Sequence, residues 1–137
     1  MFVLGLQGSP RAKGNTSTLL STFLDEVGRL GGRVHALDVT KMKVLPCLGC
    51  GVCERKGYCP QDDDMQGAYP LLRKADLVVL ATPIYFYGAT AQLKAFIDRS
   101  QALWSRKYVL DLEDPMRKWR KGFLLAVGAT KGKNLFD

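Results

Sequence analysis

The sequence predicts an α/β fold in which a doubly wound parallel sheet carries helices on both faces. Two observations lead to this prediction. Short apolar runs of strand length alternate with longer segments whose apolar residues recur at helical spacing. The chain of 137 residues is also 47% hydrophobic and 24% charged, which suits a single globular domain over residues 1–137 with a buried core.

The first third of the chain predicts a strand, a helix and a second strand. Residues 2–6 form an apolar run, and leucine, phenylalanine and valine recur at helical spacing over about residues 16–30. Gly31 and Gly32 are typical of a helix end, and residues 33–38 alternate as in a strand. Strand, helix and strand in succession favour parallel pairing with a right-handed crossover.

The middle of the chain predicts a short helix and then a central strand. We expect the helix to follow the aspartates at 62–64, which suit its first turn, and Pro70 to start or kink its final turn rather than lie inside it. Residues 77–81 are an unbroken apolar run, as in a parallel strand covered on both faces, and we expect them to lie beside the first strand.

The last third predicts one helix and a fourth strand. Leu93, Phe96, Ile97 and Leu103 have the spacing of the core face of a helix, and residues 123–127 form another strand-length apolar run. Ligand loops of such a sheet lie at the carboxyl ends of its strands, so the loops after the first, third and fourth strands are candidates for a binding site.

The loop after the first strand has the composition of a phosphate site. The start of a helix offers unpaired N–H groups and a partial positive charge. Gly8 and Gly14 permit unusual backbone angles, and donors stand at Ser9, Arg11, Asn15, Thr16 and Ser17. Neither the P-loop nor the dinucleotide fingerprint is present, and ordinary helix capping remains an alternative interpretation.

Four cysteines form a C-x2-C-x2-C-x5-C run at Cys47, Cys50, Cys53 and Cys59. Three interpretations are open from the spacing: a [4Fe–4S] cluster, a structural zinc ion, and thiols without a metal. A redox cofactor at the loop after the first strand would favour the cluster, because electrons could then pass between the two groups.

The composition of the chain limits the cellular location and the partners that we expect for the protein. The chain starts without a basic segment before its apolar run and has no stretch of about 20 apolar residues, so we expect no signal peptide, no membrane partner and a cytoplasmic location with reduced cysteines. The net charge of +7 includes a basic segment with two tryptophans, but no nucleic-acid motif accompanies it. We therefore disfavour a nucleic-acid partner. The basic residues of this segment are Arg99, Arg106, Lys107, Arg117, Lys118, Arg120 and Lys121.

Several segments in the same order resemble the iron-sulfur flavoproteins of the NADPH-dependent FMN reductase group, which have flavodoxin-like folds. They are Gly8–Arg11 with Gly14–Thr16, Pro46–Cys53, Gly57–Cys59, Asp63–Met65, Pro83–Phe86 and Leu93–Arg99. The resemblance covers most of the chain, with the cysteines in a loop insertion at about residues 46–62. It departs at the end, where the fifth strand and closing helix of a flavodoxin-like sheet are missing.

The resemblance implies a role for each candidate residue. The phosphate of FMN would lie on Ser9, Arg11, Asn15, Thr16 and Ser17. The isoalloxazine ring would be bordered by Pro83, Ile84, Tyr85, Phe86 and Tyr87, with Gly128, Ala129 and Thr130 on its other side. The thiolates of Cys47, Cys50, Cys53 and Cys59 would ligate the cluster.

The function expected from these features is that of a flavin-dependent oxidoreductase. It would pass electrons between a carrier such as ferredoxin and a small-molecule acceptor, and the resemblance implies a homo-oligomer. An NAD(P)H-dependent FMN or quinone reductase with a cluster-free or zinc-bound cysteine loop is the second hypothesis, and a zinc-stapled binding module without flavin is the third. No acid–base pair stands out, so no catalytic side chain is assigned.

Overall fold

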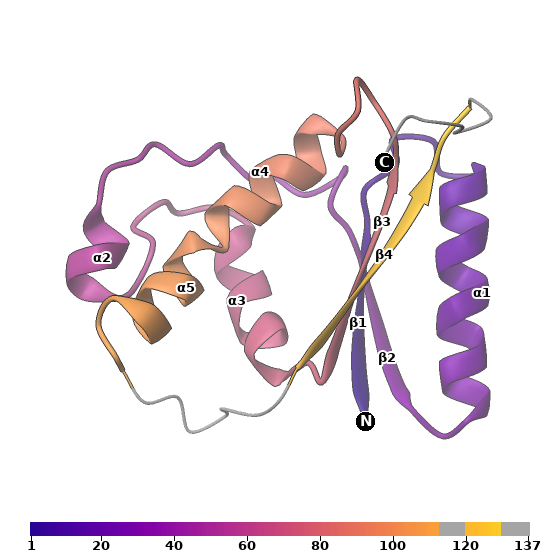
Figure 1. Ribbon diagram of the computed structural model, residues 1–137, viewed down its shortest axis with the longest axis horizontal. Helices are drawn as coiled ribbons and strands as arrows, with labels where there is room; N and C mark the ends of the chain where they lie inside the picture. Colours follow the sequence, from indigo (N-terminus) through magenta and orange to yellow (C-terminus); the bar gives the residue numbers. More distant parts are fainter. Residues whose placement is uncertain (113–119, 130–137) are drawn as a thin grey trace.

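A computed structural model describes residues 1–112 and 120–129, and the strands within these ranges form one parallel sheet (Figure 1). The strand order is β2-β1-β3-β4, and all three neighbouring pairs are parallel. The third strand thus lies beside the first, as predicted. The strands are β1 (Phe2–Gln7), β2 (Arg33–Asp38), β3 (Leu77–Pro83) and β4 (Lys121–Val127).

Helices lie on both faces of the sheet. Figure 1 shows α1 alone on one side and the other helices on the opposite side, which confirms the doubly wound α/β prediction. None of the helices in the described ranges is both long and apolar enough to cross a membrane. The helices are α1 (Asn15–Arg29), α2 (Val52–Lys56), α3 (Met65–Lys74), α4 (Ala91–Arg99) and α5 (Gln101–Tyr108).

The core is divided between the two faces because successive side chains of a strand point in opposite directions. Val3 of β1 packs in one apolar cluster with residues of α1, including Leu20 and Leu24. Leu4 and its alternate neighbour Leu6 pack in the other cluster, which contains residues of α3 and α4. Burial of both faces explains why β1 and β3 are almost continuously apolar.

Gly8 follows the end of β1 and is hydrogen-bonded to β3 and to the start of α4. Its N–H donates to the carbonyl oxygen of Ala81 at 2.8 Å, and its own carbonyl accepts from the Thr90 hydroxyl at 2.7 Å. A Cβ at this position would lie 2.9 Å from the Ala81 oxygen and equally close to Leu93. A side chain at this position would collide with the backbone of β3 and with Leu93 of α4, so the position requires glycine.

Three details of the sequence prediction were wrong. The helix expected after residue 88 is two helices that meet at Ser100, and Ile97 is 39% exposed rather than part of the core. Pro70 lies inside α3, where it removes one backbone donor and crowds the preceding turn, while the buried residues Met65 and Ala68 hold the helix against the core. The cysteine segment contains the short helix α2, which its lack of periodicity did not reveal.

Strand β4 forms the far edge of the sheet and is largely exposed. Phe123 and Leu124 are 52% and 64% accessible, although Phe123 contacts Phe23 of α1 with ring centroids 5.9 Å apart. An apolar edge strand presents both unpaired backbone groups and hydrophobic side chains.

Candidate functional site

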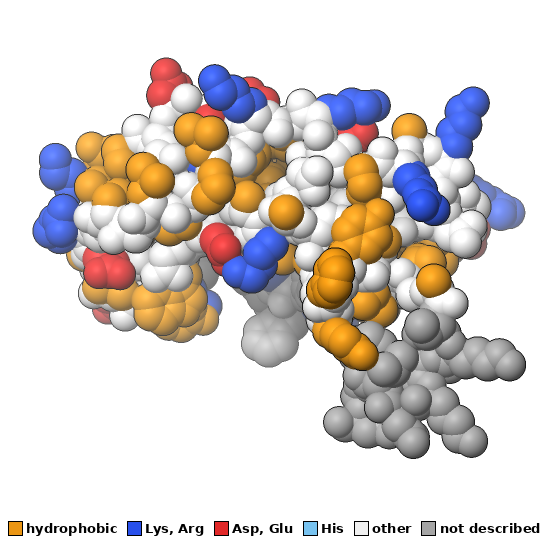
Figure 2. Space-filling model, turned by 90° about the horizontal axis from the view of Figure 1, so that it is seen from above, with side chains coloured by type: hydrophobic (Ala, Val, Ile, Leu, Met, Phe, Trp, Pro, Cys, Tyr) orange, Lys and Arg blue, Asp and Glu red, His pale blue; other side chains and the backbone are white. Residues whose placement is uncertain are grey.

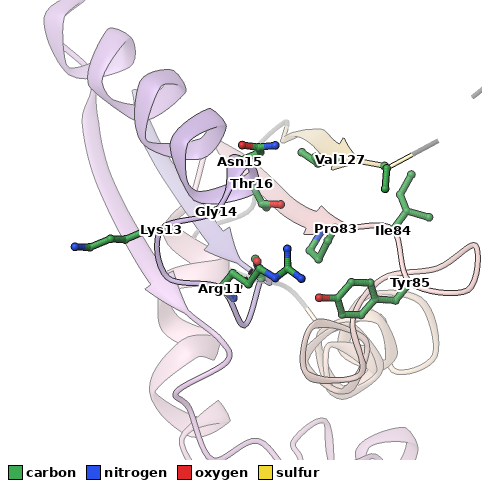
Figure 3. A pocket seen from close by; sticks show the side chains of 12 residues that line it. Arg11, Lys13, Gly14, Asn15, Thr16, Pro83, Ile84, Tyr85 and Val127 are labelled. Carbon is green, nitrogen blue, oxygen red and sulfur yellow. Dashed lines mark hydrogen bonds between the residues drawn. The ribbon is translucent and has the colours of Figure 1, made fainter. Parts of the chain in front are cut away.

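A cavity of about 550 Å³ opens at the carboxyl edge of the sheet, where all three predicted loops meet (Figure 3). Its lining comes from the loop after β1 with the start of α1, from the end of β3 and its loop, and from the end of β4. The lining residues are Ser9, Arg11, Lys13, Gly14, Asn15, Thr16, Pro83, Ile84, Tyr85, Val127, Gly128 and Ala129.

The start of α1 offers the cavity a set of backbone donors. Gly14 is the N-cap in an extended conformation and provides no capping side chain, and the first helical bond runs from Thr18 N–H to the Gly14 carbonyl at 3.1 Å. The N–H groups of Asn15, Thr16 and Ser17 precede that bond, so they have no acceptor within the helix. Free donors at the positive end of a helix dipole are what an anion such as a phosphate monoester needs.

The loop after β1 is held in shape by its own hydroxyl groups. The Ser9 hydroxyl accepts from the Arg11 N–H at 3.2 Å, and the Ser17 hydroxyl donates to the Arg11 carbonyl at 3.1 Å. The Gln7 amide donates to Ser17 at 2.7 Å. Ser17 therefore supports the loop from behind rather than lining the cavity, and Gln7, a polar residue ending an apolar strand, is a supporting residue that sequence reasoning missed.

The two basic residues of the loop, Arg11 and Lys13, point in different directions. In Figure 3 the Arg11 guanidinium and the Tyr85 hydroxyl point toward one another across the opening, whereas Lys13 extends away from it. The Thr16 hydroxyl lies at the inner wall, and the residue is only 3% exposed. An anion placed at the start of α1 would thus meet one charged side chain and one buried hydroxyl.

The loop after β3 turns sharply at Phe86 and Tyr87. Tyr85 and Gly88 exchange two backbone hydrogen bonds of 3.0 Å, and the two residues between them have φ angles of 47° and 63°. Positive φ at both central positions defines a type I′ turn, which favours asparagine and glycine and is strained with aromatic residues. The turn swings Phe86 fully into solvent and leaves Tyr87 72% exposed.

Most of the predicted flavin residues meet at one cavity. Ser17, Phe86 and Tyr87 do not line it, and Thr130 lies outside the described residues. The cavity is also lined by Lys13, Gly14 and Val127, which were not predicted as site residues. The sequence indicated them only by their position next to predicted site residues. The predicted residues that do line it are Ser9, Arg11, Asn15, Thr16, Pro83, Ile84, Tyr85, Gly128 and Ala129.

The four cysteines line a second, smaller cavity of about 70 Å³. Cys47 and Cys50 are exposed, and Cys53 and Cys59 are half-buried. Within residues 1–112 and 120–129, no three histidine, cysteine or acidic side chains are close enough together to form a ready-made metal site. The sulfurs therefore share one cavity without converging on one point.

The chemistry of this cavity nevertheless fits a thiolate-bound metal centre. Four thiols are the ligand set of either an iron–sulfur cluster or a structural zinc ion. Gly49, Gly51 and Gly57 have φ angles of 63°, 67° and 75°, so the backbone between the cysteines turns where only glycine does so without strain. The Ser105 hydroxyl also donates a hydrogen bond to the Cys53 sulfur at 3.7 Å.

A buried ion pair forms one wall of the cysteine cavity. Arg99, which the sequence analysis counted with a basic surface segment, is 1% exposed, and both oxygens of Asp63 accept from its two terminal nitrogens. Burial by itself raises the pKa of Asp63, but hydrogen bonds from Arg99 and from the N–H groups of Leu45 and Met65 hold that pKa below its ordinary value. Asp63 is thus ionised at neutral pH.

The Asp63–Arg99 pair was not found from the sequence. Three consecutive aspartates suggested helix capping, and Asp63 does accept from the Met65 N–H at 3.1 Å. Asp63 also pairs with Arg99, which is 36 positions away, and no local sequence pattern predicts a contact between residues so far apart. The available clue was only that both residues stand in segments resembling the same family.

The family model described as NADPH-dependent FMN reductase matches residues 1–134. Among curated proteins, an iron-sulfur flavoprotein of Archaeoglobus fulgidus is 42% identical over 99 residues, which are 72% of this chain and 45% of that protein. An iron-sulfur flavoprotein of Methanosarcina thermophila is 32% identical over 131 residues, 96% of this chain and 65% of that protein. The chain therefore spans about half to two thirds of the length of these relatives.

Solved structures support the fold. A flavone reductase superposes with a TM-score of 0.68 at 20% identity, covering 96% of this chain and 44% of that one. The NAD(P)H:quinone oxidoreductase from Methanothermobacter marburgensis superposes with a TM-score of 0.67 at 14% identity, covering 96% and 87%. The strand order and these neighbours confirm the predicted flavodoxin-like architecture.

Proposed function

This chain belongs to the NADPH-dependent FMN reductase family of flavin-dependent oxidoreductases, and from that premise we propose that it binds FMN in the 550 Å³ cavity and transfers electrons through it. The single observation behind the proposal is that the start of α1 and the loops after β3 and β4 line one cavity. Anion donors thus lie at one wall, and an apolar and aromatic strip at the other.

The phosphate of FMN would be held by the loop after β1. We assign it to the N–H groups that open α1, the hydroxyl groups of Ser9 and Thr16, the Asn15 amide and the Arg11 guanidinium. Ser17 would act indirectly by fixing the loop through the Arg11 carbonyl. Charge-assisted hydrogen bonds of this kind are about twice as strong as neutral ones, so this end of the cavity would supply much of the affinity.

The flavin ring would lie along the loops after β3 and β4. Pro83, Ile84 and Tyr85 would border one side and Gly128 and Ala129 the other, with Thr130 adjacent in sequence. Phe86 and Tyr87 would cover the ring only if the strained turn folded inward. Bound FMN supplies the capacity to accept and release electrons, and the surrounding side chains orient the ring and exclude water.

We further propose that Cys47, Cys50, Cys53 and Cys59 hold a [4Fe–4S] cluster. The relatives named iron-sulfur flavoprotein and the shared cavity of the four thiols support this assignment. Electrons would then pass between a carrier such as ferredoxin and a small-molecule acceptor by way of cluster and flavin.

We also propose that the protein is cytoplasmic and forms a homo-oligomer. The exposed aromatic turn and the apolar β4 edge present surfaces suited to a second subunit.

The second candidate function is an NAD(P)H-dependent FMN or quinone reductase whose cysteine loop is cluster-free or holds zinc. The exposure of Cys47 and Cys50 favours it. In that case the nicotinamide would reduce FMN directly, and activity would survive the loss of iron.

Anaerobic purification followed by iron, sulfide, zinc and flavin analysis separates these functions. We expect about one FMN per chain with flavin absorption bands, together with a broad cluster absorbance that dithionite bleaches. Flavin with zinc and no iron would favour the second function. A preparation that takes up no added FMN would reject both.

A further inference from the structure

The Arg99 side chain is a buried cation whose position is fixed on several sides. Its Nη1 donates to the Leu45 carbonyl at 2.9 Å, its Nη2 donates to Asp63 at 3.0 Å, and the Tyr69 hydroxyl donates to the Arg99 carbonyl at 2.9 Å. The side chains of both Arg99 and Asp63 are completely buried. Such a rigid pair places a positive charge at a defined point in a medium of low dielectric constant.

This cation borders the cysteine cavity and is incompletely satisfied. Arg99 lines the cavity together with the four cysteines. Its Nε is buried and has no hydrogen-bond partner among the described residues. An unpaired buried N–H is costly, so its presence in a residue that lines the cysteine cavity points to an acceptor that belongs there.

Ser105 provides a second donor to the same set of thiols. It is completely buried in α5, and its hydroxyl donates to the Cys53 sulfur at 3.7 Å. The Gln101 amide donates to this hydroxyl at 3.5 Å and so leaves the serine proton free for the sulfur. Helices α4 and α5 thus present one charged side chain and one hydroxyl to the cysteine cavity.

We propose that Arg99 and Ser105 are positioning residues that raise the reduction potential of the metal centre bound by the cysteines, with Asp63 limiting the effect of Arg99. The inference rests on the proposed [4Fe–4S] function. Reduction adds one electron from an external donor and one negative charge to the centre. A neighbouring cation and a hydrogen bond to a ligating sulfur both stabilise the more negative state, and the Asp63 carboxylate destabilises it.

The test is an anaerobic potentiometric titration of the iron–sulfur signal by absorbance and electron paramagnetic resonance, which reports the centre separately from FMN. Arg99→Gln removes the charge and should lower the ratio of reduced to oxidised centre at a fixed potential at least tenfold, or 59 mV for a one-electron couple. Arg99→Lys keeps the charge and should stay closer to the original potential. Asp63→Asn should shift the potential upward instead.

Ser105→Ala supplies a variant that disturbs the fold little, and Ser100→Ala is its matched control. The Ser100 hydroxyl donates to the Phe96 carbonyl at 3.1 Å and to no cysteine, although it stands at the junction of the same two helices. We expect Ser105→Ala to lower the potential and Ser100→Ala to leave it unchanged. This pair decides the inference if the Arg99 and Asp63 variants fail to fold.

The outcomes separate the inference from the function beneath it. If the unmodified protein binds no iron and sulfide, the proposed cluster is wrong and the inference falls with it. If the cluster is present, equal shifts in Arg99→Gln and Arg99→Lys, or equal effects of Ser105→Ala and Ser100→Ala, would show a merely structural role. Opposite shifts on removing Arg99 and Asp63 would support electrostatic tuning.

Discussion

Thr16 illustrates how one residue serves both the fold and the proposed site. Its side chain is 3% exposed and belongs to the first turn of α1, yet it lines the cavity. Its place at the inner wall, next to free backbone donors, is consistent with a ligand oxygen completing the arrangement.

We predict that Thr16→Val weakens FMN binding about tenfold to a hundredfold. Valine has nearly the same shape, and a hydrogen bond to a charged group contributes about 1.5–3 kcal/mol. Flavin fluorescence during titration measures the affinity. Thr18→Val is the matched control, because this exposed hydroxyl, two positions further along α1, donates to the Gly14 carbonyl and lies outside the cavity. Equal losses in the two variants would contradict the assignment of Thr16.

Asp63 makes folding stability depend on pH. Its pKa is lower in the folded protein than in the unfolded chain, despite the opposing effect of burial, because Arg99 and two N–H groups stabilise the carboxylate. The folded state therefore binds its proton less readily. The stabilisation is fully present above the unfolded pKa of about 3.9 and is lost as the pH falls through the lower folded pKa.

Asp63→Asn should accordingly reduce the free energy of unfolding at pH 7 by about 3–5 kcal/mol, the cost of breaking a buried pair. The difference from the unmodified protein should narrow below about pH 4. Urea denaturation at pH 7, 5, 4 and 3 measures both effects. A difference that stays constant across this range would show that the charge of Asp63 contributes nothing.

At the scale of elements, the turn between β3 and α4 stores strain at the rim of the flavin cavity. The described elements around it have regular backbone, but Phe86 and Tyr87 both adopt the left-handed region. Figure 2 looks onto this end of the molecule and shows hydrophobic side chains gathered there. Strain of this kind is retained in proteins at sites where binding uses it.

We predict that the double substitution Phe86→Asn with Tyr87→Gly stabilises the folded chain by about 1 kcal/mol, because asparagine and glycine suit a type I′ turn. The same change should weaken FMN binding by removing two rings proposed to cover the flavin. Urea denaturation and flavin titration measure the two effects. Higher stability with unchanged affinity would remove Phe86 and Tyr87 from the proposed site.

On the scale of the whole molecule, the two candidate sites are built from separate parts of the chain. The 550 Å³ cavity uses the carboxyl edge of the sheet, whereas the cysteine cavity uses the segment around α2 and the junction of α4 with α5, and no lining residue is shared. In Figure 1 the segment containing α2 lies far from α1, beyond α3 and α4. Within one chain, each site is therefore expected to load without the other.

We predict that Cys50→Ala abolishes the cluster absorbance while FMN affinity stays within about twofold, since mutations at distant sites are usually independent. Iron analysis and flavin titration on the same preparation measure both quantities. Conversely, Thr16→Val should leave the iron content unchanged. A joint loss of iron and flavin in either variant would show that the sites are coupled.

Much of the architecture was predictable because it depends on local patterns. Apolar runs located β1, β3 and β4, alternation located β2, helical periodicity located α1, and the aspartates at 62–64 marked the start of α3. The carboxyl-edge rule then brought loops from three distant segments to one cavity. Prediction failed where a residue's environment outweighed its pattern, as at Ile97, which has core spacing but lies on the exposed side of α4.

The sequence by itself determined the parallel α/β fold, the glycine-containing loop after the first strand and the cysteine run, since periodicity, glycine placement and spacing are local properties. Tertiary structure alone decided that Arg99 is buried against Asp63, that Ser105 reaches Cys53, and that Phe86 turns into solvent. The physical reason is that these facts depend on which segments pack together, and the free energy of a buried charge or a strained turn is set by neighbours far away in the chain.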